Sequence, residues 1–540
     1  MTIFIAITFF LCIILGRLFY VQVIWGEELQ EKALDQWTRE LPVIAPRGKI
    51  TDVNGVVLVD NRDTYTVFLR KRAVTEKDKV VKALSSVLNL SENYLLDRID
   101  NTVSGEIVIK RQVEKALIDK ILEYKLNGIY YSRDNSRVYP YNNMLSSVLG
   151  FTSADGKGQA GLELYYDKYL GGEDGEILYE TDIVGIEIEN GKISYLPAKA
   201  GLNVKLTIDF DVQSLCEKVA IKSYEAHSAK STSIIVLDPN TGAVLGLAKS
   251  PSTDLNNIDR SNLDSLNSLI RNNVISDVYE PGSTFKVLTT AANIEEYLNG
   301  NKNAYSTSHV FSSSRYRYID GQRVKCWSDH KNGKHSSLNI EGALNNSCNP
   351  IFVDMAMSLG KETMYKYIEL FNYGSVTGID FLGESSGMVL PYYSVQNVDL
   401  ARIAFGQTIA VTPLQLAAAT AAAINGGKYY TPYFLDSIYT NNGTIIEQNV
   451  PRLKNKVISE KASKILNELL EKVVADGSGK HAYIEGYRVA GKTGTAQKYQ
   501  NGVIAQGKYV SSFVGYFPAN SPKYLALVII DEPVGQYYGS

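Results

Sequence analysis

The sequence predicts an α+β protein that follows an N-terminal membrane helix. Three observations support this: residues 1–16 carry no charged side chain, residues 63–195 alternate helical stretches with short strands, and residues 201–540 mix longer helices with hairpins. With 540 residues, 45% of them hydrophobic and 21% charged, the chain is long enough for two or three domains. We therefore expect an anchor at 1–26, an N-terminal domain at 27–200 and a C-terminal domain at 201–540.

The apolar N-terminal stretch has the length of a membrane helix. Residues 18–26 continue apolar after the single Arg17, whereas a core helix would be expected to show a polar face. A cleaved signal peptide is the alternative, but no small-x-small cleavage site stands near the end of the stretch. No Lys or Arg precedes it, so the positive-inside rule gives no support for an orientation. We expect a single-pass anchor in the cell membrane, with the bulk of the chain extracytoplasmic.

Turn residues bound the predicted elements of the N-terminal domain. Asn54-Gly55 predicts a hairpin turn into a strand at 56–59. Hydrophobic periodicity predicts a helix at Lys77–Leu88 and a strand at Glu106–Lys110. The run Pro197-Ala198-Lys199-Ala200-Gly201 predicts the linker to the second domain.

The C-terminal domain reads as helices between hairpins. Thr412-Pro413 is an N-cap followed by proline at the first helical position, and Gly426-Gly427 ends that alanine-rich helix. The predicted elements are a strand at 204–208, a helix at 211–227, a hairpin with strands at 233–237 and 243–249, a helix to Ile424 and closing strands at 511–517 and 524–530.

Three short motifs stand in one order along this second domain. They are Ser283-Thr284-Phe285-Lys286, Ser347-Cys348-Asn349 and Lys492-Thr493-Gly494-Thr495. Each alone has a bland interpretation, as a capping serine, a surface lysine or an ordinary turn. The ordered set, with each member in a fitting local context, argues against those interpretations.

The first motif has the spacing of an activated serine. A turn at 279–282 leads into a periodic helix from Ser283 to Glu296, so Ser283 and Lys286 share one face. A serine hydroxyl needs a base, and Lys286 can be one only as the neutral amine. A helix N-terminus and a second cation both depress a lysine pKa. Lys492 is the expected second cation.

The other two motifs complete a candidate catalytic site. Residues 489–496 predict a strand edge rich in small residues, along which a substrate peptide can pair. The N–H groups of Thr495 and Ser283 would bind the developing oxyanion. Ser347 would relay a proton and Asn349 would hold a substrate carbonyl. The predicted catalytic residues are Ser283, Lys286, Ser347, Asn349 and Lys492, and the predicted substrate-binding residues are Thr493, Gly494 and Thr495.

The charge balance excludes one class of partner. The net charge is −3, and the sequence offers no basic stripe that could neutralise phosphates. We therefore expect no nucleic-acid partner.

The motifs, with further stretches along nearly the whole chain, resemble the class B penicillin-binding proteins, and within them the stage V sporulation protein D group. The three motifs correspond to the SxxK, SxN and KTG signature. The further matching stretches are Arg47-Gly48 with Asp52 and Asn54-Gly55, Arg137 with Tyr139-Pro140, Leu149-Gly150, Gly161-Leu162-Glu163, residues 206–209 with Gln213, residues 279–282, residues 405–407, and Thr412-Pro413 with Gln415.

The resemblance implies a penicillin-binding transpeptidase fold, an antiparallel sheet flanked by helices, on an elongated mixed α/β pedestal domain. It implies an enzyme that cross-links D-Ala-D-Ala stem peptides of peptidoglycan through an acyl-enzyme, in cell-wall or spore-cortex synthesis. Such an enzyme needs no cofactor for catalysis and is acylated by β-lactam antibiotics. A membrane glycan polymerase, a glycosyltransferase, is the implied partner, because class B chains have no polymerase domain. The family continues beyond the position of residues 535–540, so we expect a truncated C-terminus.

Three other functions compete with this interpretation. A β-lactamase would need a base that activates water, and the sequence identifies no such glutamate. A β-lactam sensor would need a cytoplasmic signalling region, for which the few residues before the anchor leave no room. A non-catalytic wall-synthesis scaffold would not need the five predicted catalytic residues, all of which are present.

A group of potential metal-binding residues lies just before the second motif. Residues 325–335 hold two of the five histidines, next to Cys326 and Asp329, and Cys348 can fold back toward them. Zinc prefers such a set, and Cys326, Asp329, His335 and Cys348 form the predicted structural zinc site. His330 is the alternative to Asp329 or His335; His335 is preferred because it matches the family pattern. Free thiols in a structural loop, or a Cys326–Cys348 disulfide, are the other interpretations.

Overall fold

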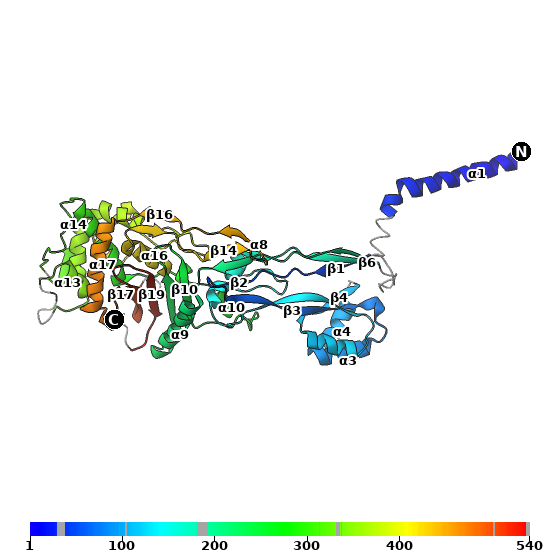
Figure 1. Ribbon diagram of the computed structural model, residues 1–540, viewed down its shortest axis with the longest axis horizontal. Coiled ribbons are helices and arrows are strands. Elements are labelled where there is room, and N and C mark those ends of the chain that lie inside the picture. The colour runs from blue at the N-terminus through cyan, green and yellow to red at the C-terminus, as the bar shows by residue number, and fades with distance from the viewer. Residues whose placement is uncertain are drawn as a thin grey trace.

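The molecule is elongated, and its parts follow one another along the long axis (Figure 1). The computed structural model describes residues 1–29, 38–102, 105–180, 193–312, 314–330, 335, 337–500 and 503–535. The C-terminal domain forms one end, the N-terminal domain the middle, and helix α1 (Thr2–Phe19) lies at the other end (Figure 1). Residues 331–334, between His330 and His335, lie outside the described residues.

Helix α1 is the only described helix long and apolar enough to cross a membrane. With a π-helical turn at Tyr20–Ile24 it spans 23 residues, has a mean hydropathy of 2.4, and buries none of its side chains in the protein. At a rise of 1.5 Å per residue it is about 35 Å long, enough for a hydrocarbon core of about 30 Å. The predicted helix at the N-terminus is therefore present as a candidate membrane span.

The outer part of the N-terminal domain has a small core of its own. The long strand β3 (Val57–Arg70) pairs with β4 (Glu106–Val113) and β5 (Ile129–Val138), both antiparallel. Helices α3 (Lys77–Leu88), α4 (Glu92–Asn101) and α5 (Lys115–Glu123) pack against this sheet. The helix predicted at Lys77–Leu88 is confirmed in its bounds, because its apolar positions recur at helical spacing and face the core.

One seven-stranded sheet continues from the N-terminal domain into the C-terminal domain. Strand β8 (Asn203–Leu206) pairs in parallel with β2 (Ile50–Thr51) and antiparallel with β14 (Leu435–Tyr439). Strand β15 (Ile445–Gln448) extends the sheet beyond β14. A separate three-stranded sheet has the order β1 (Thr38–Val43), β6 (Gly175–Glu180), β7 (Ile193–Leu196). The two domains are therefore joined by backbone hydrogen bonds as well as by the linker.

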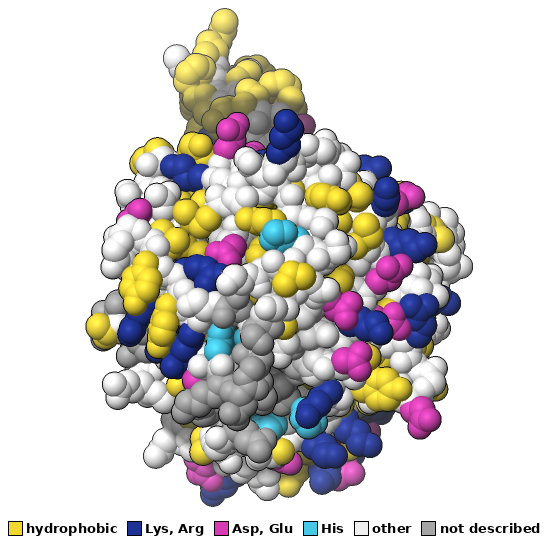
Figure 2. All heavy atoms as spheres, turned by 90° about the vertical axis from the view of Figure 1, so that its left-hand side faces the viewer, with side chains coloured by type: hydrophobic (Ala, Val, Ile, Leu, Met, Phe, Trp, Pro, Cys, Tyr) yellow, Lys and Arg dark blue, Asp and Glu magenta, His cyan; other side chains and the backbone are white. Residues whose placement is uncertain are grey.

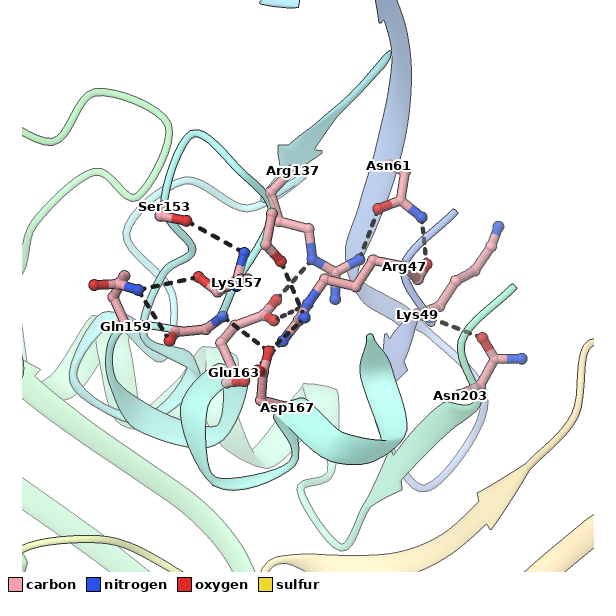
Figure 3. Close-up of polar contacts among 12 residues, drawn as sticks. Arg47, Lys49, Asn61, Arg137, Ser153, Lys157, Gln159, Glu163, Asp167 and Asn203 are labelled. Carbon is pink, nitrogen blue, oxygen red and sulfur yellow. Dashed lines mark hydrogen bonds and ion pairs between the residues drawn. The ribbon is translucent and has the colours of Figure 1, made fainter. Parts of the chain in front are cut away.

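A buried ion network holds the N-terminal domain together beside this junction (Figure 3). Glu163, on the short helix α7 (Gly161–Tyr165), is fully buried between two arginines. One carboxylate oxygen accepts from Arg47 Nε at 2.7 Å and the other from Arg137 Nε at 2.8 Å. Asp167 pairs with Arg47 at 2.6 Å. Three matching stretches that are far apart in the sequence thus converge on one carboxylate.

We expect Glu163→Gln to destabilise the protein strongly. The amide keeps the shape but leaves two buried guanidinium groups without their shared counter-charge, which costs about 3–5 kcal/mol of the free energy of unfolding. Glu173→Gln is the matched control, because the Glu173–Lys199 pair is about 75% exposed on both sides and such pairs contribute at most about 1 kcal/mol. Urea unfolding measures both variants, and equal unfolding midpoints would contradict the account.

The C-terminal domain is built on a five-stranded antiparallel sheet with helices on both faces. Its order is β10 (Val244–Ser250), β9 (Ser231–Leu237), β19 (Tyr524–Asp531), β18 (Val503–Phe517) and β17 (Ala490–Gln500). Helix α9 (Phe210–Ala226) packs on one face. The helices associated with the main core are α10 (Leu263–Ile270), α11 (Asn273–Ser276), α12 (Lys286–Leu298), α13 (Ile340–Asn345), α14 (Asn349–Leu370), α15 (Asn397–Ile403), α16 (Pro413–Ile424) and α17 (Glu460–Ala475). The predicted strand, hairpin and helix positions of this domain are confirmed to within two residues at most described ends, with β18 beginning earlier than predicted.

Helix α16 shows why its sequence is rich in alanine. Every one of its residues is buried, and its alanines allow the surrounding helices and sheet to pack closely against it. Its start is a capping box: the Thr412 hydroxyl accepts from the Gln415 N–H at 3.0 Å, and the Gln415 side chain accepts from the Thr412 N–H at 2.9 Å. The sequence prediction of an N-cap at Thr412 is confirmed.

Candidate active site

The serine of the first motif lies on a single 3-10 turn. Residues Gly282–Phe285 form this turn, and α12 begins at Lys286. Side chains three residues apart eclipse in a 3-10 helix, so Ser283 Oγ and Lys286 Nζ meet at 3.0 Å. Gly282 has φ +55°, and a Cβ there would lie 2.9 Å from the carbonyl oxygen of Thr495. The glycine before the serine therefore lets the turn approach strand β17.

Lys286 is fully buried and surrounded by oxygen atoms. Its Nζ lies 2.8 Å from the carbonyl oxygen of Ser347, 2.9 Å from Ser347 Oγ and 2.7 Å from Asn349 Oδ1. A neutral amine has two N–H groups and one lone pair. The carbonyl and amide oxygens can only accept, so they can take both N–H groups and leave the lone pair for the proton of a hydroxyl such as Ser283. The arrangement suits a lysine that acts as a base.

The second motif joins two helices at the back of the site. Helix α13 ends at Asn345 and α14 begins at Asn349. Between them Ser347 has φ +50°, a left-handed conformation that a non-glycine residue keeps only when its surroundings enforce it. Trp327 Nε1 donates to the carbonyl oxygens of Asn346 and Ser347, at 3.1 Å each. The tryptophan thereby helps to hold Ser347 between the two lysines.

The third motif brings the second lysine. Lys492 on β17 is fully buried, and its Nζ lies 3.2 Å from Ser347 Oγ. Burial, and then the nearby Lys286, hold the pKa of Lys492 well below its ordinary value. Thr493 Oγ1 lies 3.2 Å from Ser478 Oγ. The structure thus brings Ser283, Lys286, Ser347, Asn349 and Lys492 together, as the sequence predicts; their catalytic roles stay a prediction.

The buried Lys286 gives the site a pH dependence. Burial lowers the pKa of Lys286 to about 7, and the nearby Cys326 and Cys348 oppose that shift. Raising the pH deprotonates Lys286, so the neutral fraction should rise from about a tenth at pH 6 to about nine tenths at pH 8.

We therefore expect acylation by a fluorescent penicillin to become about tenfold faster from pH 6 to pH 8 and then to level off. The second-order rate constant of adduct formation measures this, with circular dichroism at both pH values as the control for folding. A rate that stays constant or falls over this interval would contradict Lys286 as the base.

A cleft of about 630 Å³ opens in front of the serine. The backbone of the third motif forms one wall, with Thr493, Gly494 and Thr495 all lining the cleft. A Cβ at Gly494 would lie 2.6 Å from Ser512 Oγ, so only glycine fits there. Among the described residues that line the cleft there is no Asp or Glu. This part of the chain therefore offers no carboxylate to activate water beside Ser283.

Two cysteines and two histidines cluster behind the second motif. The ligand atoms of Cys326, His330, His335 and Cys348 all lie within 4.8 Å of one another, and three of the four residues are buried. Cys326 Sγ lies 3.8 Å from His335 Nδ1, and Cys348 Sγ lies 3.9 Å from His330 Nε2. Ligands of a tetrahedral zinc ion are about 3.5–3.8 Å apart. The four residues therefore form a candidate metal-binding group whose donor types suit zinc.

The structure corrects one member of the predicted zinc set. His330, not Asp329, completes the cluster. His330 and His335 have φ values of +57° and +66°, and the left-handed turn at His330 directs its imidazole toward Cys348 rather than leaving that place to Asp329. The structure contains no disulfide between Cys326 and Cys348, which was one of the alternative interpretations.

Sequence reasoning missed several basic residues that line the cleft. Arg315, Arg323 and Lys325 lie on and beside a hairpin of β11 (Tyr316–Ile319) and β12 (Gln322–Lys325). The alternation in Arg315-Tyr316-Arg317-Tyr318 and the turn Asp320-Gly321 are the signals that could have predicted this hairpin.

Comparisons with known proteins agree with this site. The Penicillin binding protein transpeptidase domain family matches residues 232–540, and the Penicillin-binding Protein dimerisation domain family matches residues 42–206. Stage V sporulation protein D of Bacillus subtilis is 38% identical over 96% of this chain and 79% of its own length. Peptidoglycan D,D-transpeptidase FtsI of Escherichia coli K12 is 30% identical, over 98% of this chain and 86% of its own. A crystal structure of a peptidoglycan synthetase from Bifidobacterium adolescentis superposes with a TM-score of 0.72 at 27% identity, covering 93% of both chains.

Proposed function

Because the chain belongs to the class B penicillin-binding proteins and is a serine-type peptidoglycan D,D-transpeptidase, we propose that Ser283 is its nucleophile and Lys286 its base. The observation that carries this assignment is the 3.0 Å contact between Ser283 Oγ and the fully buried Lys286 Nζ. Stem peptides of peptidoglycan are its substrates, and β-lactams acylate it in their place.

In the first half-reaction Lys286 takes the hydroxyl proton while Ser283 Oγ attacks the carbonyl carbon of the penultimate D-Ala. The N–H groups of Ser283 and Thr495 stabilise the resulting oxyanion. The C–N bond then breaks, and the leaving D-Ala receives a proton through Ser347, whose Oγ lies within 3.2 Å of both lysines. Asn349 holds a substrate carbonyl. Ser283 is left as an ester of the donor stem.

In the second half-reaction the amine of a neighbouring stem attacks this ester. Lys286 accepts the proton of the amine and returns one to Ser283 Oγ as the new amide forms and the ester breaks. Hydrolysis of the ester would require an activated water, and the described lining of the cleft holds no carboxylate for that task. The site therefore favours transfer to an amine over the hydrolysis that defines a β-lactamase.

A two-substrate assay tests the proposed reaction. The enzyme, with its apolar helix in detergent, is incubated with a D-Ala-D-Ala donor and an amine acceptor, and mass spectrometry follows free D-Ala and the cross-linked dimer. We expect both products in equal amounts, and neither from a donor that ends in L-Ala-L-Ala. D-Ala release without dimer would identify a carboxypeptidase, and neither product together with no penicillin adduct would identify a scaffold.

We also propose that Cys326, His330, His335 and Cys348 bind one structural zinc ion. Four protein ligands leave no open position for water, so the role is structural. Contacts to Cys348, first, and to both histidines favour the thiolate of Cys326, whose pKa lies far below its ordinary value. Cys348 stands between Ser347 and Asn349, so the ion would brace the second motif from behind the cleft. Elemental analysis of tag-free protein should give about one zinc per chain, and a content far below one would contradict the proposal.

The remaining proposals concern the setting of the enzyme. The helix at Thr2–Ile24 would anchor the chain in the cell membrane as a single pass, with the bulk extracytoplasmic, where its substrate lies. Residues 27–200 would form the pedestal and 201–540 the transpeptidase domain. A membrane glycosyltransferase would supply the glycan strands, since a transpeptidase only joins their stems. Protease protection of the full-length chain in sealed vesicles tests the orientation.

A further inference from the structure

One wall of the cleft is strongly basic, and the catalytic residues do not account for it. Four of the described residues that line the cleft surface are Arg315, Arg323, Lys325 and Arg402. They line the same cleft as the third motif, although the whole chain has a net charge of −3. Seen from the transpeptidase end, Lys and Arg side chains lie interleaved with hydrophobic ones along the left-hand part of the face (Figure 2).

The β11–β12 hairpin has two different faces. Directly opposed residues share a face of a sheet, and Arg317 is opposite Val324. Val324 is buried, and Arg317 forms a bidentate pair with Asp354 of α14, at 2.7 and 2.6 Å. This face therefore packs on the domain. The other face carries Arg323 and Lys325, opposite Tyr318 and Tyr316, and both cations line the cleft.

Arg315, which directly precedes β11, and Arg323 on β12 both lie against the ring of Tyr316. The guanidinium of Arg315 lies 5.4 Å from the centre of the Tyr316 ring, and that of Arg323 lies 4.9 Å from the same centre. Arg315 Nε is buried without a hydrogen-bond partner, and within the described part of the chain neither arginine forms an ion pair with a carboxylate. Buried donors are normally satisfied, and like charges normally separate. Two unpaired guanidinium groups held on one ring therefore indicate a place for an anion.

The hairpin is also tied to the catalytic residues. Asn349 Nδ2 donates to the carbonyl oxygen of Lys325 at 3.3 Å. Arg402, on α15, reaches across to Gln322 of β12 at 3.1 Å. Arg402 also lies near the carboxyl group of the partly buried Glu280. The basic wall formed by Arg315, Arg323 and Lys325 is therefore positioned by the same contacts that position Asn349.

We propose that this basic wall is a subsite for a free carboxylate of the donor stem upstream of its D-Ala-D-Ala bond. The proposal rests on the transpeptidase function above and names the stems that the enzyme prefers. Arginine pairs with carboxylates through two parallel N–H donors, which a neutral amide cannot replace. Every donor carries the carboxylate of its terminal D-Ala. A preference among donors therefore has to come from a second carboxylate, upstream of that residue. That carboxylate belongs either to the D-Glu at position two or to a diaminopimelate at position three.

Three synthetic donors of sequence L-Ala-γ-D-Glu-diaminopimelate-D-Ala-D-Ala test the proposal: one with both upstream carboxylates free, one amidated at position two and one amidated at position three. The full-length enzyme should lose about 10- to 100-fold in kcat/KM when the recognised carboxylate is amidated. The position at which amidation causes the loss identifies which of the two carboxylates is recognised. In Arg323→Gln and in Arg315→Gln, the kcat/KM values for the free and the amidated donors should differ by no more than about threefold. Arg72→Gln, an exposed arginine of the N-terminal domain, is the matched control and should keep the full loss.

The outcomes separate this inference from the proposed function. Wild-type enzyme that forms a penicillin adduct yet treats all three donors alike would overturn the subsite and leave the transpeptidase assignment intact. A preference for free carboxylates that persists unchanged in both arginine variants would place the recognition elsewhere and also overturn the subsite. Absence of any penicillin adduct in the wild type would instead contradict the proposed function. Melting of each variant within a few degrees of the wild type confirms that the comparison is made on folded protein.

Discussion

Ser283→Ala is expected to abolish the penicillin adduct. The substitution removes the proposed nucleophilic oxygen while it leaves Lys286, Ser347 and Lys492 in contact with one another. Loss of a serine nucleophile typically lowers the rate of the chemical step by about 10⁴-fold or more. Intact-protein mass spectrometry with a labelled penicillin should show one adduct on the wild type and none on the variant.

Ser521→Ala is the matched control for that experiment, because Ser521 is exposed and outside the described lining of the cleft. It should acylate at the wild-type rate. An adduct on Ser283→Ala of the same stoichiometry and rate as on the control would show that another residue is the nucleophile.

Cys348→Ser is expected to have the second-largest effect. If zinc is bound, the serine hydroxyl is a poor replacement for a thiolate ligand, so the bound zinc should fall from about one per chain toward zero. Structural metal sites contribute directly to folding, and a loss of several kcal/mol corresponds to a fall in melting temperature of roughly 10 °C. Acylation should also slow, because residue 348 separates Ser347 from Asn349.

Cys216→Ser is the control, because it replaces a buried thiol that lies outside the proposed zinc site. Cys216 lies in α9, packed against the sheet, so its substitution should cost only about 1 kcal/mol and leave the zinc content unchanged. Equal melting temperatures and equal zinc contents for the two variants would end the zinc proposal. Free thiols in a structural loop would then be the remaining interpretation.

The sequence predicted which five side chains the structure brings together, because the proposed chemistry restricts the residue types. A serine and a lysine three apart, a second lysine on a strand of small residues, and a serine–asparagine pair leave few other uses. It did not predict that the first motif is a 3-10 turn. That geometry depends on the close approach of Gly282 to the backbone of Thr495, more than 200 residues later in the chain.

The zinc set shows a different limit of sequence reasoning. Ligand types and spacing singled out residues 326–348, yet Asp329 and His330 are adjacent and equally able to coordinate. The choice between them depends on the positive φ of His330, which no spacing rule contains. The basic wall escaped prediction for a related reason. The hairpin beside which Arg315 lies and which carries Arg323 and Lys325 precedes the third motif by more than 150 residues, and only the fold brings the two to one cleft.

The ion network of the N-terminal domain could be predicted only in part from the sequence. Arg47, Arg137 and Glu163 stood out as members of separate matching stretches, but their mutual contact spans 116 residues of sequence from Arg47 to Glu163. Local periodicity carries no information about such pairs. The helix at Lys77–Leu88, by contrast, needed only its own apolar spacing.

The central claim is that the enzyme works through an ester on Ser283. The most direct test is to quench the enzyme in acid after brief exposure to penicillin, digest it, and map the added mass by tandem mass spectrometry. The account predicts a single modified peptide, with the intact penicillin attached at Ser283. A modification that maps to any other residue would contradict it.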